Sequence, residues 1–266
     1  MMLAPTDQSR IEQRHGRTGA AQASRLPPGA NIDEIIRSRR TVRAFLPDPV
    51  PRHVLAEIIE LAARAPSTFN TQPWRLHVVT GAARQALVAA ILEAHAGNAA
   101  PPFTPFPNPQ PDDCASLQVE FGRLYYAALS IDRDDQAARA RQTARNYCFF
   151  GAPVGLLFSI DARLTRNSWV DIGLFLQTLM LAAHARGLGT CPQVSLLRYE
   201  RVIASHLGFS ENESLVCAMS LGHPDPDAPV NRMAIPRQSS TAFAKWHGFD
   251  ARSDGRAFAP TAQIGD

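Results

Sequence analysis

The sequence predicts one domain, from Asn31 to residue 266, that combines helices with strands. The chain of 266 residues is 45% hydrophobic and 19% charged, which is enough apolar material for one substantial core. Two apolar runs, 152–160 and 215–221, have the length and composition of buried strands. Elsewhere apolar residues recur at helical spacing, as in 54–62. These three observations together favour a mixed helix and strand architecture.

Each element is expected for a local reason. Asn31 can cap the first helix, with Glu34 three residues later in the pattern of a capping box. Pro51 suits the first position of the second helix, where its missing N–H costs nothing. We expect helices at 31–36, 51–62, 82–95, 117–130, 134–147 and 169–186, and strands at 76–79, 152–160 and 215–221.

Two segments are expected to lie outside the regular structure. Residues 1–30 carry several arginines without an apolar stretch, so we expect a disordered N-terminal tail rather than a secretory signal. The insertion near 97–113 contains six prolines, which exclude a regular element, and we expect it to form a lid over a substrate.

Charge and cysteine content exclude several classes of protein. A net charge of +3 is too small to favour nucleic acid as a partner. The helix expected at 169–186 is rich in apolar residues but contains too many polar ones to be a membrane span. The four cysteines are far apart, without the spacing of a metal site. We therefore expect free thiols, no metal and a cytoplasmic location.

A basic motif at 39–43 predicts a phosphate site. Its three arginines, Arg39, Arg40 and Arg43, are joined by the hydroxyl of Thr41. Arginine offers a planar fork of donors that suits a phosphate monoester. In an extended segment, Arg39, Thr41 and Arg43 would share one side, so they could grip a single phosphate from one edge.

A second motif follows at 65–74, where Pro66 ends a helix and small polar residues lead into an apolar strand. Together, and in this order, the two motifs resemble the opening of the FMN-dependent nitroreductase family. Every fixed position of that opening is filled here, with Thr41 in the hydroxyl slot and Arg43 in the final basic slot.

The resemblance implies an α+β fold of the nitroreductase type, with a mostly antiparallel central sheet wrapped by helices. It also implies an intertwined homodimer, with the helix at 169–186 at its centre and two FMN molecules at the subunit interface. In that arrangement, residues 66–70 would face the flavin bound mainly by the partner.

The same resemblance implies a set of FMN contacts. Arg237 would return to the phosphate beside Arg39 and Arg43, and the backbone of Pro192 and Gln193 would lie against the flavin ring. Residues 187–193 are expected to form a turn, whose glycines would let the backbone approach this flat ligand closely. Gln142 and Asn146 are alternatives for a polar contact to the ring. The implied cofactor-binding residues are Arg39, Arg40, Thr41, Arg43, Pro66, Ser67, Asn70, Pro192, Gln193 and Arg237.

The implied activity is hydride transfer from NADPH or NADH through FMN to a small electron acceptor, a nitroaromatic or a quinone, in a ping-pong cycle. The flavin carries such chemistry, so no side chain is assigned as catalytic. Alternatives of the same fold are a reductive dehalogenase, whose relatives have Glu where Gln72 stands, and a flavin-cleaving enzyme, whose relatives have apolar or glycine residues at 68–71. A non-catalytic flavin-binding sensor is the third alternative.

Overall fold

The computed structural model describes residues 31–97 and 106–248. The expected N-terminal tail lies outside the described residues, as do residues 98–105 of the proline-rich insertion. The chain divides into a larger unit that extends to Met233 and a smaller unit that begins at Ala234. The prediction that a single domain continues to residue 266 stays a prediction.

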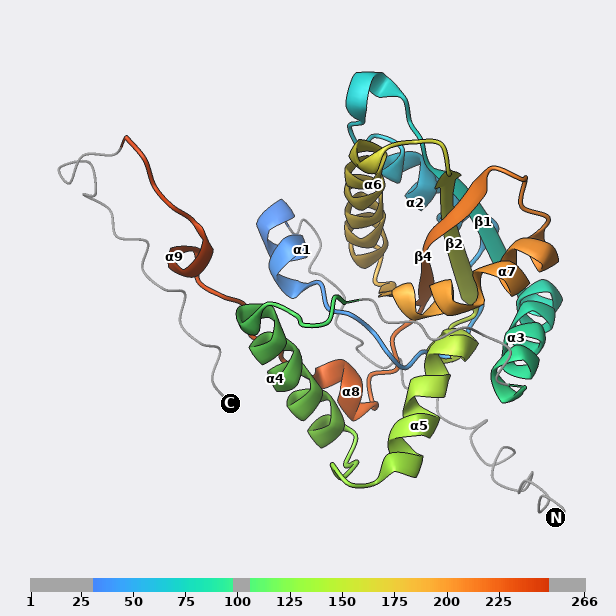
Figure 1. Ribbon diagram of the computed structural model, residues 1–266. Helices are drawn as coiled ribbons and strands as arrows, with labels where there is room; N and C mark the ends of the chain where they lie inside the picture. Colours follow the sequence, from blue (N-terminus) through green and yellow to red (C-terminus); the bar gives the residue numbers. More distant parts are fainter. Residues whose placement is uncertain (1–30, 98–105, 249–266) are drawn as a thin grey trace, which may run out of the picture. The chain divides into compact units, whose positions relative to one another are not determined.

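The larger unit is built on one four-stranded antiparallel sheet in the order β1-β2-β4-β3 (Figure 1). The strands are β1 Arg75–Thr80, β2 Val154–Asp161, β3 Gly189–Gln193 and β4 Glu213–Gly222. The expected antiparallel sheet and three of its strands are confirmed. The prediction of a turn throughout 187–193 is wrong, because residues 189–193 form the edge strand β3. An edge strand tolerates a proline such as Pro192, since one of its sides needs no ladder hydrogen bond.

The six helices expected from the sequence are present, although their ends differ, and three further helices, α7, α8 and α9, were not expected. They are α1 Ile32–Ser38, α2 Arg52–Ala62, α3 Gly81–Ala96, α4 Asp112–Ala128, α5 Gln136–Ala144, α6 Arg166–His184, α7 Glu200–Leu207, α8 Pro229–Arg232 and, in the smaller unit, α9 Ser240–Phe243, with short 3-10 helices η3 Thr68–Asn70, η4 Arg145–Gly151 and η5 Val194–Tyr199.

Two predicted helix boundaries are wrong. The helix expected at 117–130 starts five residues earlier, with Asp112 and Asp113 in its first turn, where carboxylates favour the helix dipole. The helix expected to reach Tyr147 ends at Ala144 and continues as η4, in which Phe149 and Phe150 have positive φ angles.

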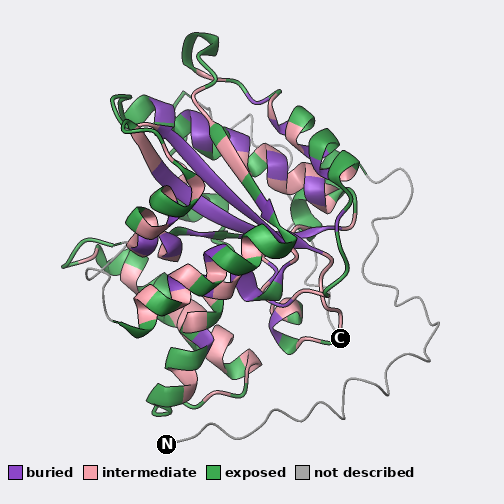
Figure 2. Ribbon diagram, turned by 90° about the vertical axis from the view of Figure 1, so that its right-hand side faces the viewer, coloured by how far each residue is buried: buried purple, intermediate pink, exposed green. Residues whose placement is uncertain are grey.

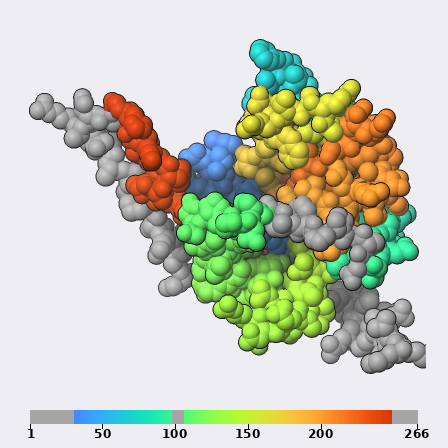
Figure 3. Space-filling model, viewed as in Figure 1, coloured from blue at the N-terminus to red at the C-terminus, as the bar shows by residue number. Residues whose placement is uncertain are grey.

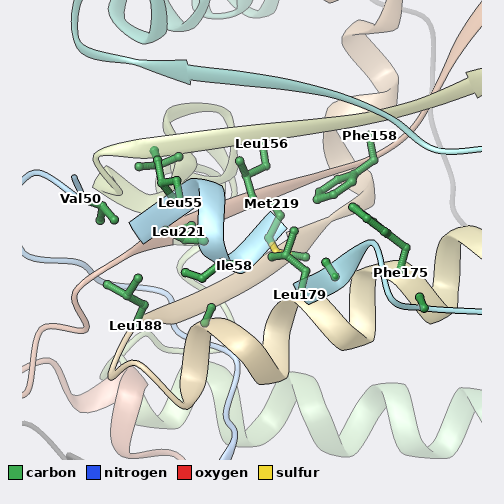
Figure 4. Close-up of a cluster of buried hydrophobic side chains, with 14 residues drawn as sticks. Val50, Leu55, Ile58, Leu156, Phe158, Phe175, Leu179, Leu188, Met219 and Leu221 are labelled. Atoms are coloured by element: carbon green, nitrogen blue, oxygen red, sulfur yellow. The ribbon is translucent and has the colours of Figure 1, made fainter. Parts of the chain in front are cut away.

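Helices cover both faces of the sheet, and Figure 2 shows the strands buried between them. On one face, Leu55 and Ile58 of α2 and Leu179 of α6 pack against the sheet (Figure 4). The other face carries α3, η5 and α7, which contribute among others Leu87 and Ile203. Alternate residues of β2 point to these two cores, which is why that strand is apolar throughout.

The outer side of α6 carries exposed apolar side chains in the single chain. Trp169 is 47% exposed, Val170 64% and Leu174 40%. The neighbouring helix α1 adds Ile32 and Ile36, which are also exposed. The apolar residues of α6 therefore form two faces, one packed in the core and one exposed to solvent in the single chain. Among the described residues, no helix is long and apolar enough to cross a bilayer.

Candidate functional site

The basic motif forms an extended segment beside β3. Arg39 caps the C-terminus of α1, and Thr41 pairs with Thr190 in an isolated bridge, where the Val42 N–H donates to the Thr190 carbonyl at 2.9 Å. Val42 is buried, whereas Thr41 and Arg43 are only partly buried. Arg40, expected on the same side as Val42, is exposed, and its Nη1 donates to the Arg232 carbonyl at 3.4 Å. Burial therefore agrees with the predicted alternation only from Thr41 to Ala44.

Gly189 allows this close approach of two backbone segments. A Cβ added at Gly189 would lie 2.5 Å from Val42 Cγ2, a separation that real side chains do not adopt. The sequence interpretation assigned the glycines of 187–193 to contact with a flat ligand. In the structure Gly189 makes room for Val42, so its role is to dock the basic segment onto the sheet.

The backbone of Arg43 is fixed by a residue that the sequence analysis missed. The Arg43 N–H donates to Asn231 Oδ1 at 2.8 Å. Asn231 Nδ2 in turn donates to the carbonyls of Ala44 at 2.8 Å and Asp225 at 2.9 Å. This amide therefore ties the basic segment to the chain that follows β4. Its position in a turn-rich stretch gave no signal of that contact.

The Arg43 guanidinium lies over two aromatic rings of α4. Its Cζ is 5.2 Å from the centre of the Phe121 ring and 5.3 Å from that of Tyr125. The Tyr125 hydroxyl accepts a hydrogen bond from Gln142 Nε2 at 2.7 Å. Burial raises the pKa of Tyr125, which keeps its hydroxyl protonated at neutral pH. These ring contacts leave the edge of the guanidinium, where its donors lie, for a ligand.

The structure also describes both candidates for a polar contact to the flavin ring. Gln142 is buried and donates to Tyr125. Asn146 Nδ2 donates to the Thr143 carbonyl at 3.0 Å, and the Asn146 carbonyl accepts from Gln193 Nε2 at 2.7 Å. Each side-chain amide thus has a partner within the chain, and the choice between them stays open.

The Gln193 side chain is buried and hydrogen-bonded within the chain. Its Oε1 accepts from Ser220 Oγ at 2.6 Å, and its Nε2 donates to the Asn146 carbonyl at 2.7 Å. Burial raises the pKa of the nearby Cys217 thiol to about 11. Pro192 has no N–H to donate, and the contact of the Gln193 backbone with a flavin stays a prediction. Pro192 itself is exposed at the edge of β3.

The second motif forms a tight loop anchored to α6. The Thr68 N–H and Oγ1 both donate to Asp171 Oδ1, at 3.1 and 3.3 Å. Ser67 Oγ accepts from the Gln72 N–H at 3.0 Å, and Asn70 and Pro66 are exposed. The sequence analysis assigned no contact to Asp171 and so missed its bonds to the loop.

The two motifs lie at opposite ends of α6 in the single chain. Asp171 holds the loop near the start of the helix, whereas His184 Nε2 lies 2.8 Å from Ser38 Oγ, next to the basic segment, at its end. Thirteen residues at a rise of about 1.5 Å separate these anchors by about 20 Å. Figures 1 and 3 show the loop in cyan, well apart from the blue basic segment. Within one chain, the loop of the second motif therefore lies far from the basic segment.

Arg237 belongs to the smaller unit. Its Nη1 donates to the carbonyls of Ile235 and Pro236, both at 3.2 Å. Its return to the phosphate of a flavin beside Arg39 and Arg43 stays a prediction.

Comparison with known proteins identifies the family. The Nitroreductase family matches residues 36–223, which include the basic segment, the loop and the whole sheet. The chain belongs to this family. It is 46% identical over 220 residues to the 4-nitrobenzoate reductase of Pseudomonas putida, with 83% of this chain and 97% of the relative covered. It is 40% identical over 221 residues to the nitrobenzene nitroreductase of Ectopseudomonas oleovorans, with 82% and 97% covered.

Solved structures of this family give the same result. The chain resembles the FMN and NADPH-dependent nitroreductase NfnB from sphigopyxis sp. strain HMH with a TM-score of 0.81 and 37% identity, covering 83% of this chain and 100% of that one. NfnB from Mycobacterium smegmatis in complex with NADPH gives a TM-score of 0.77 at 35% identity, with 81% and 97% covered. The nitroreductase fold expected from the two motifs is thereby confirmed.

The residues present fit the phosphate end of FMN. A phosphate monoester carries nearly two negative charges, and residues 39–43 supply three arginines and the Thr41 hydroxyl within five positions. The Arg43 guanidinium donates no hydrogen bond to any acceptor in the described part of the chain. Within 31–97 and 106–248, no group of three or more His, Cys, Asp or Glu side chains is placed to hold a metal ion.

Proposed function

We propose that this chain is an FMN-dependent oxidoreductase that passes reducing equivalents from NADPH or NADH to a nitroaromatic or quinone acceptor. The observation that supports it most is the extended basic segment beside β3, in which Arg43 keeps its guanidinium edge for a ligand. The relatives named as nitroreductases, one of them NADPH-complexed, supply the reductant and acceptor classes. The free thiols of the chain suit a reducing compartment such as the cytoplasm.

The residues of the chain would bind and orient the cofactor. Arg39, Thr41 and Arg43 would hold the FMN phosphate, and the ring contacts of Phe121 and Tyr125 would fix the plane of the Arg43 guanidinium. Bound FMN would accept a hydride from the nicotinamide and reduce the second substrate in turn. The protein would then act by positioning, and no side chain is required as a proton donor.

We further propose that each flavin site is completed by a second copy of the chain. The loop at 66–70 lies about 20 Å along α6 from the anchor of the basic segment, so the two motifs of one chain are well separated. The exposed apolar side chains of α6 and α1 supply a surface that a partner could cover. In a homodimer, the loop of one copy would meet the arginines of the other.

The first test is the visible spectrum of the purified protein. A flavin spectrum that bleaches with NADPH under nitrogen and returns on addition of 4-nitrobenzoate would support the reductase. Bound flavin that neither NADPH nor NADH bleaches would refute it in favour of a sensor. Halotyrosine as acceptor and a screen for flavin cleavage products separate the reductive dehalogenase and the flavin-cleaving enzyme.

The second test is complementation between two defective copies. Arg43→Ala damages one half of each proposed site, and Asn70→Ala damages the other half. In a mixed dimer, one of the two sites would carry both substitutions and the other would be native. We expect co-expressed variants to regain FMN binding that neither shows alone. Absence of recovery in a verified mixed dimer would mean that each site is built from one chain.

A further inference from the structure

A single buried carboxylate fixes the loop of the second motif. Asp171 is 3% exposed, and its Oδ1 accepts from both the N–H and the hydroxyl of Thr68. These bonds cross from α6 to a segment 103 residues earlier in the chain. Hydrogen bonds to a charged acceptor are stronger than those between neutral groups. Asp171 is therefore the main polar anchor of this loop on the helix.

The loop needs such an anchor because its backbone is strained. Phe69, Asn70 and Gln72 have φ angles of 50°, 59° and 47°, in the left-handed region that residues with a Cβ rarely adopt. Phe69 is 98% exposed, so packing of its side chain within the chain does not hold this conformation. Conformations of this kind persist only where surrounding contacts impose them.

The second oxygen of Asp171 argues against a role in stability alone. Asp171 Oδ2 is buried and has no hydrogen-bond partner within the described residues. A buried carboxylate oxygen without a donor costs free energy of folding, and an apolar residue of similar size would avoid that cost. The carboxylate therefore imposes a conformation on the loop at some expense to the fold.

We propose that Asp171 is a positioning residue for the flavin site, which acts through Thr68 to hold the loop at 66–72 in the conformation that contacts FMN. The inference rests on the proposed function, because it takes Ser67 and Asn70 of this loop as cofactor contacts. Asp171 would act through Thr68 and the loop rather than on the cofactor directly. Its role is to remove the freedom that the loop would otherwise lose on binding FMN.

The test compares three substitutions at the anchor. Asp171→Ala removes the acceptor, Asp171→Asn keeps one acceptor oxygen without the charge, and Thr68→Val removes only the hydroxyl donor. Ser168→Ala, a buried polar residue one turn earlier in α6, is the matched control. The readouts are the FMN dissociation constant of the full-length apoprotein, the melting temperature, and hydrogen exchange of the backbone at 66–72 against that of the sheet.

We expect Asp171→Ala to weaken FMN binding about tenfold or more and Thr68→Val about threefold or more, which is the scale of charge-assisted hydrogen bonds. Exchange should accelerate at 66–72 and not in the sheet. Asp171→Asn should recover most of the affinity, and Ser168→Ala should bind as the parent does.

Two outcomes would overturn the proposal. Parental FMN affinity in both Asp171→Ala and Thr68→Val would show that the anchor is irrelevant to the site. Equal losses in Asp171→Asn and Asp171→Ala, with faster exchange throughout the sheet, would show that Asp171 supports only the fold. A parent protein that binds no FMN would instead refute the proposed function, so the two failures are distinguishable.

Discussion

Replacement of Arg43 by alanine measures how much this guanidinium contributes to the proposed binding of the FMN phosphate. A hydrogen bond from a charged donor contributes about 1.5–3 kcal/mol, so the substitution should weaken FMN binding by about 10- to 150-fold. The guanidinium also lies within 5.2 and 5.3 Å of two ring centres. Loss of these cation–π contacts should lower the free energy of unfolding of the apoprotein by about 0.5–1 kcal/mol. The effect on binding should therefore exceed the effect on stability.

The assay is titration of the apoprotein with FMN, followed by quenching of flavin fluorescence, together with thermal unfolding without FMN. Arg43→Lys keeps the charge but not the planar fork, and its affinity should fall between those of the parent and Arg43→Ala. Arg52→Ala is the matched control, because it removes an exposed arginine from the first turn of α2 and changes the net charge equally.

Two results would refute this reasoning. If Arg43→Ala and Arg43→Lys bind FMN as the parent does, the basic segment does not hold the phosphate. If Arg52→Ala loses as much affinity as Arg43→Ala, the effect is one of net charge rather than of a site.

Three further predictions concern other parts of the chain. Arg237→Ala should weaken FMN binding by about 1.5–3 kcal/mol without lowering the apoprotein melting temperature, and unchanged affinity by the same titration would remove this residue from the site. Burial and the nearby Arg39 lower the pKa of His184 in the folded protein. Below about pH 6.5 the unfolded chain therefore binds this proton more readily than the folded chain, and the free energy of unfolding decreases as the pH is lowered. Melting temperatures from pH 8 to pH 5 should fall less steeply in His184→Asn, and parallel curves would contradict this. A thiol reagent at pH 8 should modify the exposed Cys114 first, whereas burial, which raises the pKa of Cys191 to about 12, should protect that thiol until unfolding. Rapid modification of Cys191 in the folded protein, detected by mass spectrometry, would be inconsistent with its position in β3.

Local patterns predicted much of the fold correctly. Asn31 and Glu34 form the expected capping box, with bonds of 3.1 and 2.9 Å, because both partners lie within one turn. The alternation at 41–44 and the apolar run of β2 also depend only on neighbouring residues. Such features follow from backbone periodicity, which the sequence carries directly.

Contacts between distant segments could not be predicted in the same way. Asn231 meets Arg43 across 188 residues, and Asp171 meets Thr68 across 103. Nothing in the spacing of these side chains marks them as partners, since the pairing depends on the packing of whole elements. The strand β3 was missed for a related reason, because its glycine and proline are turn residues unless an adjacent strand pairs with them.

Helix α6 contacts both motifs of the proposed site, one near each of its ends, and it also carries part of the surface proposed to form the dimer. This helix anchors the loop through Asp171 near its start and contacts Ser38 through His184 at its end. If each flavin is held by the arginines of one copy and the loop of the other, FMN binds the dimer more tightly than the monomer. By linkage, FMN must then stabilise the dimer by the same free energy. Loosening the loop anchor should therefore weaken dimerisation in the presence of FMN more than in its absence.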